Sequence, residues 1–485
     1  MRLRSTAVIL ATAAAVAAGT AAISAAGQAS SIKRGARASG PSPISPSAVI
    51  IRPDAIHVGE AFSSPATTAE CEQQVHIACY GAGQIRQAYN VWPLYRKGIT
   101  GAGETIVIVD SYGSPTIKHD LAVFDAQYKL SAPPSFTIIQ PAGAVAPYEA
   151  SSNRVGWAGE TTLDVEYAHV MAPGADILLV ETPTSENEGT TGFPQIVAAE
   201  EYVLSNHLGD VISQSFSATE QTFPTAESLL NLRTAYLDAA ADGVTVLAAA
   251  GDSGAADVEY NETSYYTYPV TSWPDSDPLV TGIGGTQLHL DGVGNRTAPD
   301  SVWNDTYNVA TNEYIGGNAG PSPLAGGGGK SVIFSRPSWQ AGVAKVVGAH
   351  RGVPDISMSA ACNGAVNIYQ SFAGQAAGWY PTCGTSEATP LFAGVVALAD
   401  QMAGHPLGVI NPALYAMSAA KQPGIVEVTK GDNSVSFTQG GKLMTVTGYP
   451  ALPGYSLASG VGTVDVAKFV PELVAAVAAS SPRPL

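Results

Sequence analysis

The sequence predicts an α/β protein with a doubly wound, mostly parallel sheet flanked by helices. Short apolar runs rich in Val, Ile and Ala alternate with longer segments whose apolar residues recur at helical spacing. Strands that alternate with helices in this way form βαβ units, and such units require a parallel sheet covered on both faces. The predicted elements are, in order, a strand at 104–110, a helix at 117–130, a helix at 159–169, a strand at 175–181, a helix at 194–206, a strand at 210–215, a helix at 226–242 and a strand at 243–250.

Composition sets the size of the protein and disfavours some partners. The chain has 485 residues, 45% of them hydrophobic, which is enough for one large domain with a substantial core. Its 40 acidic and 23 basic residues give a net charge of −17, which disfavours nucleic acid and anionic membranes as partners. Only 13% of the residues are charged, and a surface made polar by uncharged side chains suits acidic surroundings.

The amino-terminal residues predict export. Residues 1–26 combine early arginines, an apolar stretch and the small residues Ser24-Ala25-Ala26, as a cleavable signal peptide does. An uncleaved anchor of ~20 residues is the alternative, and the scarcity of leucine disfavours it. Residues 27–78 are rich in Ser, Pro, Ala and Gly and predict a linker or short pro-segment, whereas residues 79–485 predict the folded domain. We expect a secreted monomer that has no membrane segment once the signal is removed.

The four cysteines, Cys71, Cys79, Cys362 and Cys383, allow three pairings. In an exported protein we prefer two local disulfides, Cys71–Cys79 and Cys362–Cys383. The second of these would fix the position of the glycine turn that follows Cys383. No C-x-x-C pair is present, which argues against a zinc site.

The best candidate for a nucleophile is Ser386, which follows Gly384-Thr385 and precedes an apolar helical run at 391–399. A glycine turn followed by a helix places this serine at a helix N-terminus, where free N–H groups and the helix dipole stabilise an oxyanion. For an arbitrary Gly-Thr-Ser sequence, a simple helix cap would be the better interpretation. The carboxylates elsewhere in the chain decide between the two.

A serine hydroxyl needs a base, and the chain offers carboxylates rather than a histidine motif for this role. Glu160 and Asp164 are spaced i, i+4 in the predicted helix, so both carboxyl groups lie on one face and the pKa of one should rise. A carboxyl group with a raised pKa suits a general base that works in acid. Asp252 follows the strand at 243–250, where open α/β sheets place their active sites, and a protonated Asp there can donate a hydrogen bond to an oxyanion.

These motifs, taken together, resemble those of the sedolisins, the serine-carboxyl peptidases. The resemblance rests on Glu160-x-x-x-Asp164, Gly251-Asp252-Ser253-Gly254 and Gly384-Thr385-Ser386-x-x-x-Pro390 in this order, and it extends over residues 79–477. It implies a subtilisin-like fold and a secreted endopeptidase that acts on protein or peptide substrates. It also implies that Glu160 takes the proton of Ser386, that Asp164 holds and tunes Glu160, and that protonated Asp252 stabilises the oxyanion.

Two alternatives stay open. A subtilisin-type protease would combine Ser386 with a histidine and with Asp110, the acid at the end of the strand at 104–110, but without a histidine motif we leave Asp110 outside the predicted site. An inactive sedolisin-like binding protein is the other alternative, because the pro-segment is short and the calcium region is altered. All four catalytic positions hold the residue types that the chemistry needs, and this favours the enzyme.

The resemblance also implies a calcium region at 411–462, with weakened ligands. Glu427 and Ser456 stand where the family pattern has aspartates. Calcium prefers roughly six to eight oxygen ligands that include carboxylates, so we expect weak binding or none.

Three further stretches are expected near the cleft. Residues 213–217 resemble the strand that cradles the substrate in the family. The glycine run at 326–329 does not have the spacing of a phosphate loop, and we interpret it as a flexible loop near the cleft. Glu387, next to the nucleophile, would bias the cleft against acidic side chains.

Overall fold

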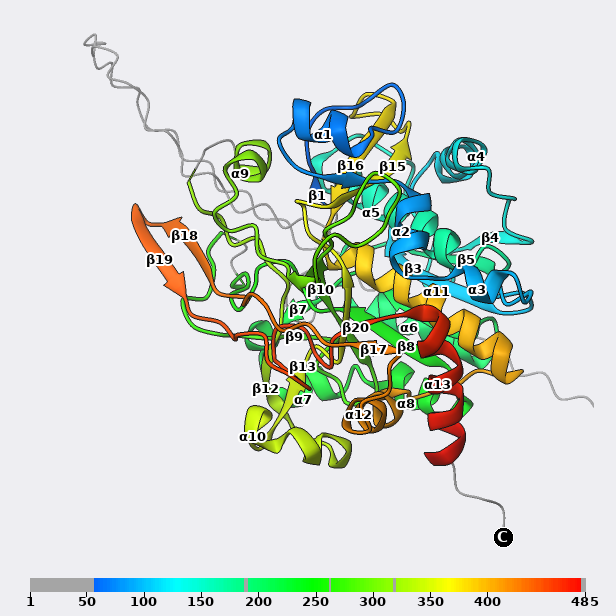
Figure 1. Cartoon of the computed structure of the whole chain (residues 1–485). Coiled ribbons are helices and arrows are strands. Elements are labelled where there is room, and N and C mark those ends of the chain that lie inside the picture. Colours follow the sequence, from blue (N-terminus) through cyan, green and yellow to red (C-terminus); the bar gives the residue numbers. More distant parts are fainter. Residues whose placement is uncertain (1–55, 187–190, 261–262, 317–319, 481–485) are drawn as a thin grey trace, which may run out of the picture. The chain divides into compact units, whose positions relative to one another are not determined.

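The computed structural model describes residues 56–186, 191–260, 263–316 and 320–480 (Figure 1). The predicted signal peptide and residues 27–55 lie outside these described residues. No described helix combines the length and the apolar character needed to cross a membrane.

The centre of the fold is an eight-stranded sheet in which neighbouring strands are parallel except at the β10–β11 edge. Its spatial order is β11-β10-β8-β6-β3-β5-β4, with β14 paired to β10. This architecture confirms the predicted doubly wound, mostly parallel α/β fold. The strands are β3 (Thr105–Ser111), β4 (Phe136–Ile139), β5 (Asp176–Thr182), β6 (Val211–Gln214), β8 (Thr245–Ala249), β10 (Thr281–Gln287), β11 (Ser301–Val302) and β14 (Ile356–Ser359).

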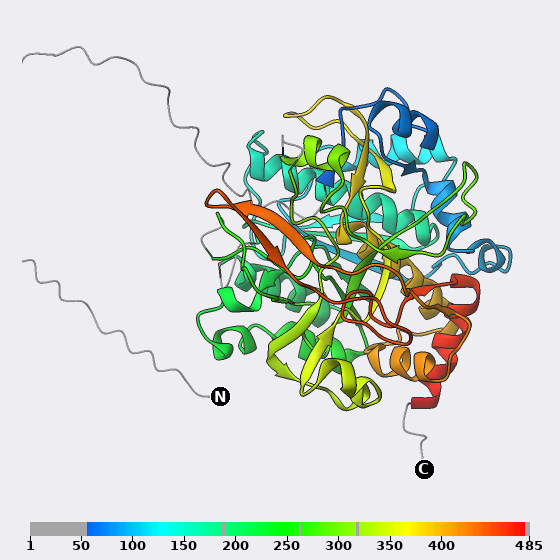
Figure 2. The same ribbon diagram turned by 60° about the vertical axis from the view of Figure 1, so that its left-hand side comes forward.

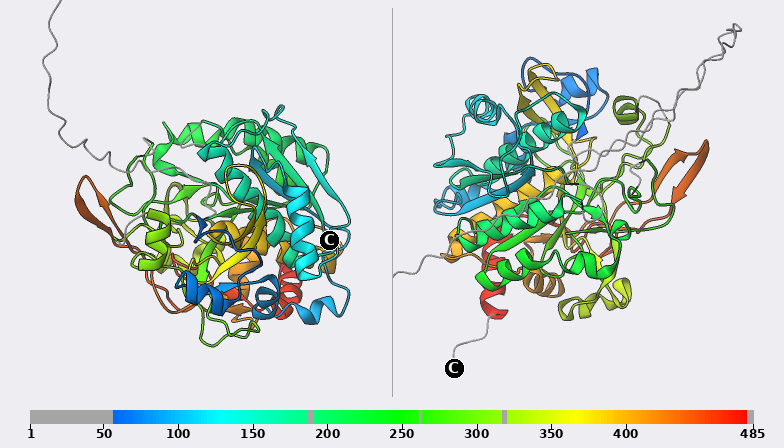
Figure 3. Two further views of the ribbon diagram at one scale, coloured as in Figure 1. Left: turned by 90° about the horizontal axis from the view of Figure 1, so that it is seen from above. Right: turned by 180° about the vertical axis from the view of Figure 1, so that it is seen from behind.

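Helices cover both faces of this sheet (Figures 1 and 3). One face packs against α5 (Ser152–Met171) and α11 (Thr385–Ala403), and the other against α6 (Phe193–Ser205) and α8 (Thr234–Asp242). Because side chains alternate along a strand, Ile106 and Ile108 of β3 enter the core under α5 and α11, whereas Val107 and Val109 enter the core under α6 and α8. A strand that is buried on both faces must be apolar throughout, as these strands are.

Most predicted helices are found close to their expected bounds, with one division. The helix expected at 117–130 is α4 (Ile117–Tyr128), whereas the one expected at 226–242 is divided into α7 (Ala226–Leu230) and α8. At the division, Arg233 donates two hydrogen bonds to the buried Asp277. This ion pair fixes the chain between the two helices. The division could not be predicted, because Asp277 is far from Arg233 in the sequence and no local pattern indicates the pair.

A second, four-stranded sheet has the order β1-β16-β15-β2 and lies outside the predicted pattern. It consists of β1 (Ile56–His57), β2 (Cys79–Tyr80), β15 (Ala365–Gln370) and β16 (Gly378–Cys383). Helix α1 (Thr68–Gln74) connects its first two strands along the chain, and both predicted disulfides, Cys71–Cys79 and Cys362–Cys383, are present. Residues 56–78, part of the stretch expected to be a linker or short pro-segment, are therefore folded onto the domain.

A β-hairpin projects beyond the layers of the fold (Figures 2 and 3). Its strands are β18 (Val435–Gln439) and β19 (Lys442–Val446), joined through Gly440 and Gly441, which both have positive φ. Phe437 of the hairpin packs against Tyr265, with ring centroids 5.1 Å apart, so the hairpin is attached to the loop that follows β8.

The remaining elements are short or lie at the periphery. They are α2 (Ala82–Ala88), α3 (Trp92–Tyr95), β7 (Ala218–Thr219), the 3₁₀ turn η1 (Glu220–Thr222), β9 (Ser272–Trp273), α9 (Val309–Gly316), β12 (Gly329–Ser335), the 3₁₀ turn η2 (Ser338–Val343), α10 (Ala344–Val347), β13 (His350–Val353), α12 (Asn411–Ala419), β17 (Ile425–Val426), β20 (Thr463–Val464) and α13 (Val466–Ser480).

Candidate active site

Ser386 lies in the first turn of α11, as its sequence context predicts. Gly384 caps this helix with φ 132°, a conformation that residues with a Cβ rarely adopt, so the tight turn depends on glycine. The Ser386 side chain is fully buried, and its Oγ has no hydrogen-bond partner among the described residues. A buried hydroxyl without a partner at a helix N-terminus differs from an N-cap, whose oxygen would bind a backbone N–H of the helix.

The helix that carries Glu160 runs parallel to the helix that carries Ser386. At the C-terminal end of α11, Gln401 Oε1 accepts a hydrogen bond from the Gly101 N–H at 2.8 Å. At the C-terminal end of α5, the Ala172 Cβ lies 3.0 Å from the position that a Cβ of Gly101 would take. Because the two packed helices end at one loop, their first turns lie at the same end. The stretch of helix from Ser386 to Gln401 is similar in length to the stretch from Glu160 to Ala172. Measured from the shared loop, Ser386 and Glu160 therefore lie at a similar height along the two helices.

Asp164 lies one turn beyond Glu160 on α5, and both side chains are fully buried. Asp164 Oδ1 accepts a hydrogen bond from the Ser215 Oγ at 2.9 Å, just after β6. This contact joins the carboxyl pair to the stretch 213–217 that was expected to cradle the substrate.

Asp252 is hydrogen-bonded to the turn that carries Ser386. Its Oδ1 accepts hydrogen bonds from the Thr385 N–H at 2.7 Å and from the Thr385 Oγ at 2.8 Å. Burial raises the pKa of Asp252 to about 7, although the two bonds from Thr385 act to lower it, and the nearby Asp257 carboxylate raises it further. The second oxygen, Oδ2, is buried without a hydrogen-bond partner among the described residues. Asp252 is thus protonated below about pH 7 and has an oxygen available as a donor.

Asp110 lies closer to this group than the sequence analysis assumed. It ends β3 fully buried, and its carboxyl faces the Thr161 hydroxyl on α5, next to Glu160. Burial raises the pKa of Asp110 to about 7, and the Glu181 carboxylate adds to this rise. The strand-end position of Asp110 was the signal in the sequence for its place near α5.

The histidines do not support a subtilisin-type arrangement. Among the described residues, no histidine donates to or accepts from the Ser386 Oγ or the Asp110 carboxyl. The one histidine on α5, His169, binds the Ser131 carbonyl and approaches Asp125 at 3.4 Å, and burial lowers its pKa to about 4.

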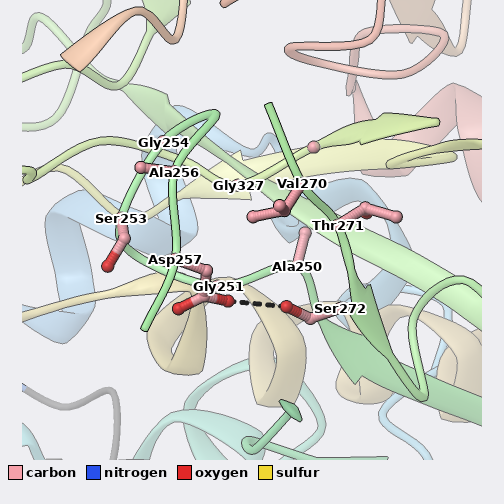
Figure 4. A pocket seen from close by; sticks show the side chains of 11 residues that line it. Ala250, Gly251, Ser253, Gly254, Ala256, Asp257, Val270, Thr271, Ser272 and Gly327 are labelled. Carbon is pink, nitrogen blue, oxygen red and sulfur yellow. Dashed lines mark hydrogen bonds between the residues drawn. The ribbon is translucent and has the colours of Figure 1, made fainter. Parts of the chain in front are cut away.

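A shallow hollow, partly open to solvent and too narrow to enclose a water molecule, lies beside Asp252 (Figure 4). Gly251 and Ser253, the neighbours of Asp252, line it together with the Asp257 carboxyl, whose Oδ2 accepts a hydrogen bond from Ser272 Oγ at 2.6 Å. A Cβ at Gly251 would lie 3.9 Å from both the Asp257 Oδ2 and the Ser217 Oγ. Glycine therefore keeps this wall of the hollow open toward the 213–217 stretch.

The glycine run at 326–329 is packed against the Asp252 turn. Gly327 donates a backbone hydrogen bond to the Gly251 carbonyl at 2.7 Å, and Ala325 donates one to the Asp252 carbonyl at 2.9 Å. A Cβ at Gly327 would lie 1.8 Å from the Ala250 carbonyl oxygen, so only glycine permits this approach. Its place near the cleft is as expected, but the interpretation as a flexible loop was wrong: the glycines serve close backbone packing.

Glu387 follows Ser386 in the first turn of α11. Its side chain is fully buried, as that of Ser386 is, and faces the Ser359 hydroxyl of β14. Burial raises the pKa of Glu387 well above its ordinary value, and the Asp252 carboxylate acts in the same direction. Its neutral form is therefore the one that the fold accommodates.

The expected calcium region does not present a set of free oxygen ligands. Ser456 Oγ accepts hydrogen bonds from the Ser459 N–H at 3.1 Å and the Ala458 N–H at 3.4 Å and also bonds to the Ser459 hydroxyl at 2.9 Å. Glu427 Oε1 accepts a hydrogen bond from the Gly454 N–H. No group of three or more His, Cys, Asp or Glu side chains suited to a metal is present among the described residues. The donor set does not fit calcium.

Comparisons with known proteins agree with this geometry. A sequence profile described as the subtilase family matches residues 142–440. Kumamolisin from Bacillus sp. strain MN-32 is 30% identical over 398 residues, which cover 81% of this chain and 63% of that protein. Sedolisin from Pseudomonas sp. strain 101 is 30% identical over 373 residues, which cover 76% of this chain and 57% of that protein. The chain thus spans about three fifths of the length of these curated relatives.

One solved structure has a fold similar to that of this chain. Pseudomonas sedolisin, a serine-carboxyl proteinase complexed with two molecules of pseudo-iodotyrostatin, superposes with a TM-score of 0.67 at 25% identity, covering 82% of this chain and 99% of that one. The architecture and these comparisons together define a chain of the subtilisin-like fold class. It belongs to the subtilase family and, with kumamolisin and sedolisin as relatives, to the sedolisin group within that fold.

Proposed function

We propose that the chain is a secreted serine-carboxyl endopeptidase that hydrolyses peptide bonds at acidic pH. The observation that carries the proposal is the convergence on one helix N-terminus. Ser386 lies in the first turn of α11, Glu160 lies near the middle of the neighbouring helix α5, and the protonated Asp252 is bonded to Thr385. A peptide carbonyl placed beside Ser386 would have a nucleophile, a base and an acid around it.

In this mechanism the Ser386 Oγ attacks the carbonyl carbon while Glu160 accepts its proton. Asp164, held by Ser215, orients Glu160. The carbonyl oxygen gains negative charge and receives a hydrogen bond from the protonated Asp252, together with the Ser386 N–H. Collapse of the intermediate breaks the C–N bond, and Glu160 returns the proton to the departing amine. Water then cleaves the serine ester by the same steps, with Glu160 again as the base.

The comparison with Pseudomonas sedolisin, described as a serine-carboxyl proteinase, supports a protein or peptide as the substrate. We further propose that the mature protein acts as an extracellular monomer.

The test is hydrolysis of a mixed peptide library by the purified secreted protein at about pH 4 and about pH 7, values that bracket carboxyl titration. We expect activity in acid and its loss in Ser386→Ala and in Glu160→Gln. Glu227→Gln, which alters an exposed glutamate on α7, is the matched control and should keep full activity. Activity at neutral pH that survives Glu160→Gln would refute the carboxyl mechanism and favour a subtilisin-type one. Inactivity of the folded wild type at both values would favour the binding-protein alternative.

A further inference from the structure

A segment upstream of the expected domain boundary is paired with the strand that leads into the nucleophile turn. We call residues 56–62 the N-terminal strap. Val58 donates a backbone hydrogen bond to the Pro381 carbonyl at 2.8 Å, and Phe62 exchanges two with Trp379 at 2.8 and 2.9 Å. In β1, Ile56 pairs with Cys383 and His57 with Thr382. The strap is thus the edge strand that covers β16 along its whole length.

The side chain of His57 adds a specific contact to this pairing. Its Nδ1 lies 2.8 Å from the Thr382 Oγ1, and the ring stacks on Tyr380 with centroids 5.0 Å apart. The Thr382 Oγ1 also lies 3.2 Å from the Tyr380 carbonyl oxygen, to which it can donate a hydrogen bond.

The other edge of the His57 ring faces the helix of the proposed base. A Cβ at Gly159 would lie 3.1 Å from the His57 Nε2 and 3.4 Å from its Cε1, so the ring approaches the backbone of α5 one residue before Glu160. Thr382 itself is four residues before Ser386 and fully buried. One imidazole therefore lies between the strand that leads to the nucleophile and the helix that carries the base.

From these contacts we propose that the N-terminal strap is a permanent part of the active enzyme and that His57 is a positioning residue, which holds β16 against α5 and so fixes the separation of Ser386 and Glu160. This role rests on the proposed peptidase function. Processing of the chain must then cut upstream of Ile56. The Cys71–Cys79 disulfide and the capping box of Thr67 with Glu70 keep the following helix α1 folded next to β2, at the opposite edge of the same four-stranded sheet.

The first test is the N-terminus of the active secreted enzyme, determined by intact-mass spectrometry and N-terminal sequencing. We expect a start at or before residue 56, with residues 56–62 present in every active species. Active enzyme that begins after Phe62 would overturn the proposal, whatever the catalytic mechanism proves to be.

The second test separates positioning from simple stability. His57→Leu removes the ring nitrogens, His57→Asn keeps a polar group at nearly the same place, and Thr382→Val removes the hydroxyl. We expect His57→Leu to lower kcat about tenfold with KM changed less than about twofold, because small misplacement of reacting groups reduces rate more than binding. His57→Asn should recover most of the loss.

A double-mutant cycle gives the decisive outcome. If His57 acts through Thr382, the loss of kcat in His57→Leu/Thr382→Val equals that of the larger single variant. Additive losses, or wild-type kcat in His57→Leu, would overturn the positioning role. Should the wild type prove to lack peptidase activity, the proposed function fails by itself. The same cycle measured on Tm then tests the strap alone: a non-additive loss supports it and an additive loss rejects it.

Discussion

At the scale of single residues, Asp252 shows how burial sets chemistry. A carboxyl group exposed to water would be ionised at pH 5 and could only accept hydrogen bonds. In this fold Thr385 occupies one oxygen as donor, and burial keeps the proton on the group up to about pH 7. The proton must then lie on the unpartnered oxygen, Oδ2, which is the geometry that an oxyanion needs.

Asp252 therefore predicts the upper limit of the pH profile. Because the protonated form is the active one and its pKa is raised to about 7, kcat/KM should fall as the pH rises through this value, whereas protonation of the base Glu160 sets the lower limit. Asp252→Asn keeps an N–H donor that does not titrate, so its profile should lose this decline, whereas Asp252→Ala should lose ~10²-fold at all pH values. Initial rates measured between pH 3 and pH 9 check both. A decline that is unchanged in Asp252→Asn would assign it to another group.

The four proposed catalytic residues could be predicted because each lies in a short motif whose spacing carries its chemistry. The roles of Thr385 and His57 could not, because their partners Asp252 and Thr382 are far away in the chain and meet only in the folded protein. The burial of Glu387 could not be predicted for a related reason. A charged residue in the first turn of a helix is usually exposed, and nothing local shows that this turn is completely buried.

At the scale of elements, the crossing of α5 and α11 fixes the geometry of the site. A Cβ atom added to Gly394 of α11 would lie 2.6 Å from the Met171 Cβ and 3.2 Å from the Ala168 carbonyl oxygen, both on α5. The two helices approach this closely because glycine has no side chain, and their separation sets that of Ser386 and Glu160.

Gly394→Ala should consequently separate the helices and lower both stability and activity. We expect a loss of ~1–3 kcal/mol in the free energy of unfolding, as for other overpacked cores. The matched control is Gly83→Ala in α2, an exposed helical glycine with nothing within 4 Å of its Cβ position, which should be neutral or stabilising by up to ~1 kcal/mol. Urea unfolding of both variants measures the difference. Equal effects of the two substitutions would show that the crossing tolerates a methyl group.

The turn at Ser456 leads to a prediction about calcium. Since its hydroxyl already accepts backbone N–H groups, the turn is closed by hydrogen bonds without a metal. A chelator such as EDTA should leave Tm and peptidase activity unchanged, and added Ca²⁺ should not raise Tm. A rise in Tm that saturates with Ca²⁺ would show that this region binds the ion after all.

The strands and helices of the central sheet could be predicted because each carries its own periodicity. The four-stranded sheet could not, because β1 and β2 are two-residue strands defined only by their partners. The hairpin of β18 and β19 was not predicted for another reason. Half of its residues are exposed, and its few apolar positions do not give a clear strand pattern.

At the scale of the whole molecule, buried carboxyl groups dominate the dependence of stability on pH. Burial raises the pKa of Asp110 and Asp252 to about 7 and that of Glu200 to about 8, and it raises the pKa of Asp275 and Asp400 well above the ordinary value. Each such group favours the folded state fully below its unfolded pKa near 4, and this stabilisation is lost as the pH rises through the folded value. The fold is thereby adapted to acid.

Thermal unfolding should accordingly give a Tm about 5 °C or more higher at pH 4.5 than at pH 8. His169 acts in the opposite direction, because its pKa is lowered to about 4 and its neutral form is lost in the unfolded state below about pH 6.5. The more numerous carboxyl groups should outweigh it. A Tm that rises steadily from pH 4.5 to pH 8 would contradict this account of the interior.

The central claim is that Ser386 forms the covalent intermediate in acid, and trapping of that intermediate tests it most directly. The protein is mixed with a peptide ester at about pH 4, quenched in strong acid within the first turnover, digested and analysed by mass spectrometry. The account predicts an acyl group on the peptide that contains Ser386, and no such adduct in Ser386→Ala. An acyl group on any other residue, or turnover without an acyl-enzyme, would contradict it.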